Sequence, residues 1–161
     1  MHERVSLRWD GDLDFEATSG DSDAVRLGGT QSPRSFGPAS LLLVSLAGCT
    51  GMDAISIMRK KRQKVEGYRI EVSGTQRDEH PRSFTSIVVV HIVEGNSIDD
   101  KAVARSIELS ARKYCVVGAS LASGDTSIEH RLRVTDEAGE RTSDCVTIGP
   151  RGAGLSHYRN G

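Results

Sequence analysis

The sequence lacks an excess of charge of either sign. Its 161 residues include 21 Lys and Arg against 22 Asp and Glu, which gives a formal net charge of −1. Without a large net field, nothing draws the chain onto nucleic acid or onto an anionic membrane surface. We therefore expect neither nucleic acid nor a membrane as a partner.

Long apolar segments are missing as well. The longest apolar run, residues 41–47, is interrupted by Ser45, and it is far shorter than the roughly 20 residues that cross a bilayer. The N-terminal segment, residues 1–20, is strand-like and charged, without the basic start and apolar stretch of a secretory signal. These features predict a soluble protein in the cytoplasm.

Metal-binding motifs are absent too. The sequence has three cysteines and five scattered histidines, with no CxxC or HxxxH pair, so the usual zinc-ligand spacings do not occur. We expect no metal and no cofactor. In a cytoplasmic protein, the three cysteines are more typical of reduced, catalytic or redox-sensing thiols than of a disulfide framework.

The stretch around which the chain is organised is SFGPASLLLVSLAGCTGMDAISIMRKKRQ, residues 35–63. Pro38 suits the first position of a helix, and the Leu, Ala and Met that follow favour one long helix from Pro38 to Arg62. Its first half is apolar on nearly every side, which is typical of a helix buried in a core or an interface. Cys49 lies between Gly48 and Gly51, two glycines that indicate a close approach to the backbone.

The remaining pattern predicts two hairpins, a second helix and a closing strand, so the fold class is α+β. One sheet cannot cover so apolar a helix, and we expect a second copy to complete the cover in a homodimer. We assign residues 1–136 to a single domain and residues 137–161 to a partly flexible C-terminal extension. The expected hairpin strands flank residues 10–12 and 77–83, the second helix spans residues 97–113, and the closing strand spans residues 128–134.

Two of the cysteines have helical contexts that suggest chemistry. A single cysteine is more often an inert buried residue, but Cys49 has its flanking glycines, and Cys115 follows Arg112 and Lys113, which could lower a thiol pKa. A thiolate that attacks a peroxide becomes a sulfenic acid, and a second thiol can condense with it to a disulfide. Cys145 lies in the C-terminal extension, and we treat it as incidental.

The long-helix segment resembles the signature helix of the OsmC-like family, which includes osmotically inducible protein C and the organic hydroperoxide resistance proteins. KYCVVGASL resembles the second-cysteine segment of that family, and the resemblance covers residues 7–134. It implies a thiol peroxidase that reduces organic hydroperoxides, with Cys49 as the peroxidatic and Cys115 as the resolving cysteine, and an external dithiol as reductant. It also implies an intertwined homodimer, in which antiparallel sheets pack around a long central helix and the active sites lie at the subunit interface.

The sequence departs from the hydroperoxide resistance branch at residues 38–40. That branch has a glutamate about three helical turns before the reactive cysteine, whereas this chain has Pro-Ala-Ser there. We expect the cation that activates Cys49 to be Arg34, or else Arg82. Asp53, one turn beyond Cys49, could replace the glutamate in positioning that arginine. Apolar side chains are expected to bind the alkyl group of the substrate: Phe36, Leu46 and Met52.

Two other functions stay open from the sequence. The same fold could hold a small lipid-like or reactive molecule in an apolar pocket, with vestigial or sensory cysteines, or it could be a purely structural stress protein. A cation close to Cys49 or Asp53 would favour the enzyme, and solvated Arg34 and Arg82 would favour the binding protein.

Overall fold

The computed structural model describes residues 3–29, 32–33 and 35–152. The chain forms two compact units, Met1–Leu42 and Leu43–Gly161. The boundary between them falls inside the long helix α1, Pro38–Lys60. The two units are described in turn.

The first unit contains a three-stranded antiparallel sheet of β1 (Ser6–Trp9), β2 (Phe15–Thr18) and β3 (Val25–Leu27). The predicted hairpin is confirmed: Trp9 pairs with Phe15 across a turn in which Gly11 has a φ of 103°. The register places apolar side chains on one face of this sheet and polar ones, such as the ion-paired Arg8 and Glu16, on the other. The apolar face is exposed: Val5, Leu7, Trp9, Phe15 and Val25.

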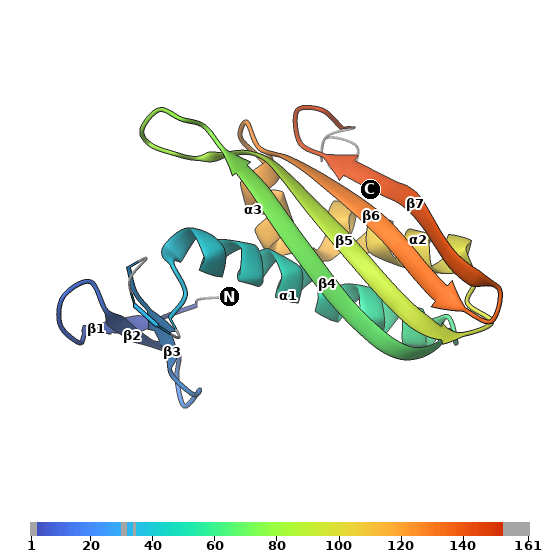
Figure 1. The fold of residues 1–161 in the computed structure, drawn as a ribbon, viewed down its shortest axis with the longest axis horizontal. Coiled ribbons are helices and arrows are strands. Elements are labelled where there is room, and N and C mark those ends of the chain that lie inside the picture. Colours follow the sequence, from blue (N-terminus) through green and yellow to red (C-terminus); the bar gives the residue numbers. More distant parts are fainter. Residues whose placement is uncertain (1–2, 30–31, 34, 153–161) are drawn as a thin grey trace. The chain divides into compact units, whose positions relative to one another are not determined.

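The second unit is a four-stranded sheet with helices on one face (Figure 1). The strands β4 (Lys64–Gln76), β5 (Phe84–Asn96), β6 (Ser127–Asp136) and β7 (Gly139–Ile148) lie in the order β4-β5-β6-β7. The helices are α1, α2 (Asp100–Leu109), the π-helical turn η1 (Ser110–Tyr114) and α3 (Val116–Ala122). The α+β class predicted from the sequence is confirmed.

The pairing of β5 with β6 corrects the expectation of wholly antiparallel sheets. These two strands run parallel, from Ser86 opposite Ser127 to Glu94 opposite Thr135. Parallel neighbours need a crossover rather than a hairpin. The crossover consists of α2, η1 and α3. These elements carry the chain back to the end of the sheet at which β5 begins, so that β6 runs in the same direction as β5.

Residues 139–148 also differ from the prediction. The sequence assigns them to a C-terminal extension, yet they form β7, which pairs with β6 from Gly139 opposite Asp136 to Ile148 opposite Ile128. Val146 and Ile148 are buried. The sequence of β7 lacks a clear alternation of apolar and polar residues, because most of its residues are polar. The register shift opposite His130 and Arg131 also interrupts the period of two.

The buried stripe of α1 follows the spacing of one helix face. Leu46, Thr50, Ala54 and Met58 recur every fourth residue and are fully buried. A Cβ on Gly51 would lie 2.6 Å from Cδ1 of Ile70 on β4, so the predicted close approach to the backbone occurs at this glycine, whereas a Cβ on Gly48 would meet nothing within 4 Å.

The length and composition of α1 would also allow it to cross a membrane. In this fold, however, Ala54 and Met58 belong to the apolar core that the helix shares with the sheet and with α2. Burial of this stripe accounts for the apolar character of the second half of the helix.

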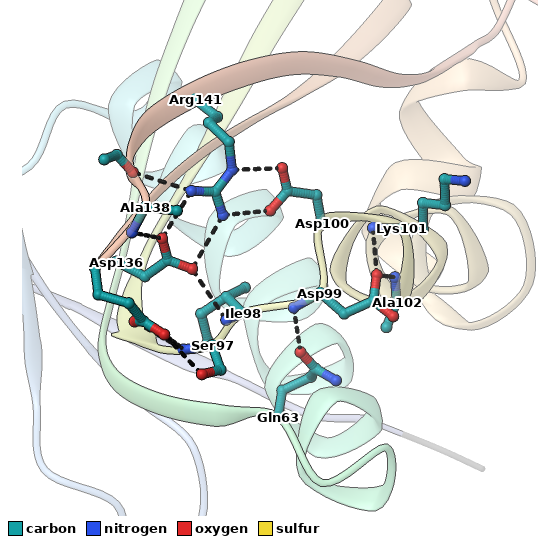
Figure 2. Close-up of polar contacts among 12 residues, drawn as sticks. Gln63, Ser97, Ile98, Asp99, Asp100, Lys101, Ala102, Asp136, Ala138 and Arg141 are labelled. Atoms are coloured by element: carbon teal, nitrogen blue, oxygen red, sulfur yellow. Dashed lines mark hydrogen bonds and ion pairs between the residues drawn. The ribbon is translucent and has the colours of Figure 1, made fainter.

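A polar clamp fixes the start of α2 to the β6–β7 hairpin (Figure 2). The Arg141 guanidinium donates to both carboxylate oxygens of Asp100 at 2.8 Å, and to Asp136 at 2.7 and 3.1 Å. This hydrogen bonding holds the pKa of Asp136 well below its usual range. Asp99 caps α2 by accepting from the backbone N–H groups of Lys101 and Ala102. The clamp and the cap together define where α2 begins.

Candidate functional site

The structure brings together Cys49 of α1 and Cys115, which are 66 positions apart in the sequence (115 − 49). Their side chains interact, since hydrogen bonding with Cys49 is one cause of the raised pKa of Cys115, and both cysteines are free. Cys49 is half-buried, and Cys115 is 3% exposed. A disulfide requires two thiols that are neighbours in space.

Cys115 is held as a protonated thiol. Burial, followed by its hydrogen bond with Cys49, raises the pKa of Cys115 to about 12, although the backbone N–H of Gly118 donates to its sulfur at 3.2 Å and opposes the shift. Cys115 is also the N-cap of α3. A buried thiol with a raised pKa is a poor initial nucleophile at neutral pH, since the thiolate is the reactive form.

The backbone just before Cys115 is a π-helical turn, residues 110–114. The N–H of Cys115 donates to the carbonyl of Ser110 at 2.9 Å, five residues earlier. Such turns are rare and occur frequently at functional sites. Here the wider turn ends α2 and sets the position at which Cys115 meets α1.

A second contact between α1 and η1 lies beside the cysteines. The Ser110 hydroxyl donates to Asp53 at 3.1 Å, and it lies 3.2 Å from the hydroxyl of Thr50. A hydroxyl has one proton, and a carboxylate attracts it more strongly than a neutral oxygen does, so Thr50 is the donor to Ser110. The negative charge of Asp53 contributes to the raised pKa of Cys115. The sequence prediction included Asp53 but missed Ser110 and Thr50, although both lie close in sequence to a candidate cysteine.

Arg82, one of the two predicted activating arginines, makes no contact with Cys49 among the described residues. Arg82 is exposed in the loop between β4 and β5, and within the described part of the chain its side chain has no hydrogen bond or ion pair. Its backbone carbonyl accepts from Gln76 at 2.6 Å. Arg34 lies outside the described residues.

The predicted substrate-binding side chains differ in their exposure. Leu46 is fully buried, and its Cδ1 lies 3.6 Å from the position that a Cβ on Gly118 would occupy. Met52 is 70% exposed. Phe36 belongs to the first unit, where it forms an isolated bridge with Leu27. Leu46 is therefore the one of these three for which the structure shows packing near Cys115.

A cavity of about 220 Å³ opens beside Asp53. Its lining combines two charged residues, Asp53 and Lys60, with Tyr114, which directly precedes Cys115. No periodic pattern in the sequence marks Tyr114, because it belongs to the π-helical turn. Two larger cavities lie on the outer face of the sheet, opposite the helices, and neither is lined by a cysteine.

A buried chain of hydrogen bonds joins three strands of the sheet. The Tyr68 hydroxyl lies 2.7 Å from Nδ1 of His91, and Nε2 of His91 lies 3.1 Å from Nδ1 of His130. Burial lowers the pKa of His91 to about 3 and that of His130 to about 4, so both rings are neutral at neutral pH. Within the described residues, Nε2 of His130 is buried and has no hydrogen-bond partner.

Comparisons with known proteins agree with this architecture. A sequence model described as OsmC-like protein matches residues 29–131. Protein YhfA of Escherichia coli K12 is 33% identical over 131 residues, which are 81% of this chain and 97% of YhfA.

Two crystal structures show the similarity of fold. An OsmC-like protein from Mycoplasma pneumoniae superposes with a TM-score of 0.72 at 16% identity, covering 83% of this chain and 97% of that chain. The organic hydroperoxide resistance protein OhrB of Bacillus subtilis superposes with a TM-score of 0.57 at 15% identity, covering 82% and 98%. The chain belongs to the OsmC-like protein family, as the sequences of α1 and of the segment around Cys115 predict.

Proposed function

We propose that this chain is a cysteine-based thiol peroxidase that reduces organic hydroperoxides in the cytoplasm, with Cys49 as the peroxidatic and Cys115 as the resolving cysteine. The observation that carries the proposal is that the fold brings these two free cysteines close enough to interact. The hydroperoxide resistance proteins that share the fold support the choice of substrate class.

The proposed cycle needs both cysteines. The Cys49 thiolate attacks one oxygen of the peroxide, an S–O bond forms as the O–O bond breaks, and the alkoxide leaves as an alcohol after taking a proton. The Cys115 thiol then displaces water from the sulfenic acid and forms a disulfide. An external dithiol reduces that disulfide by exchange and restores both thiols.

The environments of the two cysteines support this division of roles. Cys115 is almost fully buried and its pKa is raised, which suits a thiol that reacts second, with a partner already in contact. Cys49 is the more accessible of the two, as the residue that meets the substrate must be. Leu46 and Met52 are proposed to contact the alkyl group together with Phe36.

The cation that activates Cys49 remains a proposal of its own. Arg34 and Arg82 are the candidates, and Asp53 would position the arginine in place of the missing glutamate. Asp53 already accepts a hydrogen bond from Ser110 through one oxygen, which leaves its second oxygen available for a guanidinium. Lack of both arginines at the site would instead favour a small-molecule binding protein.

We also propose that the working form is a homodimer. Apolar side chains of the second unit are exposed on α1 and around Cys115: Val44, Met52, Tyr114 and Val116. Exposed apolar clusters of this kind mark interaction surfaces, and a second copy would cover α1 on the side that the sheet leaves open.

A single-turnover reaction tests the enzyme proposal. The reduced full-length protein is mixed with excess cumene hydroperoxide, quenched with a thiol alkylator and digested for peptide mass. We expect a Cys49–Cys115 disulfide within seconds, and sulfinic Cys49 when Cys115→Ser removes the resolving thiol. Cys145→Ser is the matched control and keeps the wild-type products. Two free thiols after minutes would contradict the peroxidase and favour the binding protein.

A further inference from the structure

The outer face of the four-stranded sheet, opposite the helices, carries two cavities that the peroxidase proposal does not use. Their volumes are about 510 and 300 Å³. The larger one lies over β5, β6 and β7 and is lined by Val90, Arg131, Arg133, Thr142, Ser143 and Asp144, together with Leu132. A volume of about 500 Å³ is typical of small-molecule sites, which range from about 300 to 1,000 Å³.

The register explains why these side chains meet. Arg131 lies between Val90 of β5 and Asp144 of β7, and Arg133 lies two residues further along the same face of β6, beside Thr142. At the register shift between His130 and Arg131, β7 contains one residue more than β6, which makes a bulge. Such bulges bend the strand and redirect side chains. On this face the cavity therefore has the apolar side chain of Val90, two guanidinium groups and the hydroxyl of Thr142, whereas Leu132 and Ser143 oppose each other with their side chains on the helix face.

The two arginines differ in how their charge is balanced. Nε of Arg131 lies 2.6 Å from Glu129 and 3.8 Å from Asp144, so carboxylates neutralise it. Within the described residues, Arg133 has no ion pair, and its Nε is buried without a hydrogen-bond partner. A buried donor without an acceptor is unfavourable in general. The cavity thus contains one cation without a carboxylate partner among the described residues, and its Nε donor is unsatisfied.

We propose that this cavity binds a small organic anion, whose carboxylate or phosphate group pairs with Arg133 and whose apolar part lies over Val90. A guanidinium presents its donors as a planar fork that matches the oxygens of either group. The hydroxyl of Thr142, which lies opposite Arg133, provides a further donor to the same anion. The site is on the face of the sheet opposite the cysteines, so its occupation is independent of the thiol chemistry.

Binding is tested by NMR titration of the ¹⁵N-labelled full-length protein with sodium benzoate, phenyl phosphate and neutral benzyl alcohol. Benzoate and phenyl phosphate separate a carboxylate from a phosphate ligand. We expect saturable shifts of the amides of residues 131–133 and 142–144 with at least one anion, and none with benzyl alcohol. A dissociation constant above about 10 mM corresponds to negligible binding. The proposal is therefore overturned if neither anion gives a saturable shift at concentrations up to about 10 mM.

Two variants identify the residue responsible. Arg133→Gln should weaken anion binding by about tenfold or more, because a charge-assisted pair is lost. Arg69→Gln is the matched control: Arg69 flanks Ile92 from the other side on β4, is 63% exposed and does not line the cavity. Equal binding by wild type and Arg133→Gln, or equal loss in both variants, contradicts the assignment. If Arg133→Gln does not fold, the amide shifts of the wild type decide.

Discussion

The hydroxyl of Ser110 lies 3.1 Å from a carboxylate oxygen of Asp53, and this contact ties the π-helical turn before Cys115 to the turn of α1 that follows Cys49. A partly buried hydrogen bond therefore connects α1, which carries Cys49, with the π-helical turn that ends at Cys115. The contact between the two thiols depends on how these elements are held.

Ser110→Ala should loosen that connection. The buried hydroxyl of Thr50 and the carboxylate of Asp53 each lose a partner, so we expect a loss of about 1–3 kcal/mol in the free energy of unfolding. We also expect slower formation of the Cys49–Cys115 disulfide in the single-turnover reaction. Urea unfolding and quenched mass analysis measure the two effects.

Ser120→Ala is the control for that variant. Its hydroxyl donates to the carbonyl of Val116 at an exposed position of α3, so its removal should leave both measurements near those of the wild type. Wild-type disulfide kinetics in Ser110→Ala would show that Ser110 does not position the cysteines.

Two glycines of α1 give opposite predictions for the same substitution. Gly48→Ala adds a methyl group in open space and should stabilise the helix by up to about 1 kcal/mol. Gly51→Ala places a methyl group 2.6 Å from Cδ1 of Ile70. We expect Gly51→Ala to be less stable than Gly48→Ala by about 1–3 kcal/mol. Thermal or urea unfolding of both variants measures the difference.

A rescue variant isolates the cause. Ile70→Val removes the Cδ1 atom that the new methyl group meets, so Gly51→Ala should be less harmful in the Ile70→Val background than in the wild type. Additive effects of the two substitutions would mean that the close approach at Gly51 does not set its stability.

The buried histidines predict a loss of stability in mild acid. His91 and His130 have folded-state pKa values of about 3 and 4, both below the ordinary value of 6.5. Between about pH 4 and 6.5 the unfolded chain binds more protons than the folded one, so stability is full above that window and falls as the pH falls through it. The slope approaches about 1.4 kcal/mol per pH unit for each histidine.

Urea unfolding between about pH 5 and 7.5 measures this slope, and NMR of the histidine rings tests the cause directly. We expect the ring signals of His91 and His130 to stay unchanged from about pH 5.5 to 8, because both rings stay neutral. Titration of either ring in this range would contradict the buried, neutral chain from Tyr68 to His130.

Local pattern was sufficient for part of this fold. Proline at the start, strong helix formers and a basic end predicted α1 to within two residues of its C-terminus, Lys60. The Asp-Gly turn predicted the first hairpin. These features depend on residues close in sequence, which is the range over which propensity and capping act.

Long-range pairing was not predictable in the same way. Nothing local distinguishes the parallel pairing of β5 with β6 from an antiparallel one, and β7 has too few apolar residues to be recognised as a strand from its pattern. The candidate site shows the same division. Resemblance to a family pointed to Cys49 and Cys115, whereas the support from Ser110 depends on a π-helical turn that propensity does not encode.

The exposed side of α1 gives the last prediction, which rests on the proposed homodimer. Val44 is 45% exposed on a helix whose opposite face is buried. A glutamate there would place a charge within the proposed apolar interface, and desolvating an unpaired charge is strongly unfavourable. Val44→Glu should therefore be monomeric at concentrations at which the wild type is a dimer, as sedimentation or light scattering would show.

Ser73→Glu, on an exposed position of β4, is the matched control for Val44→Glu and should remain dimeric, because the added charge stays in water. A wild type that is monomeric at every concentration, or a Val44→Glu variant that dimerises as the wild type does, would assign the exposed apolar side chains of α1 to another role. Since the proposed peroxidase places its active sites at the subunit interface, a monomeric Val44→Glu should also form the Cys49–Cys115 disulfide more slowly than Ser73→Glu does.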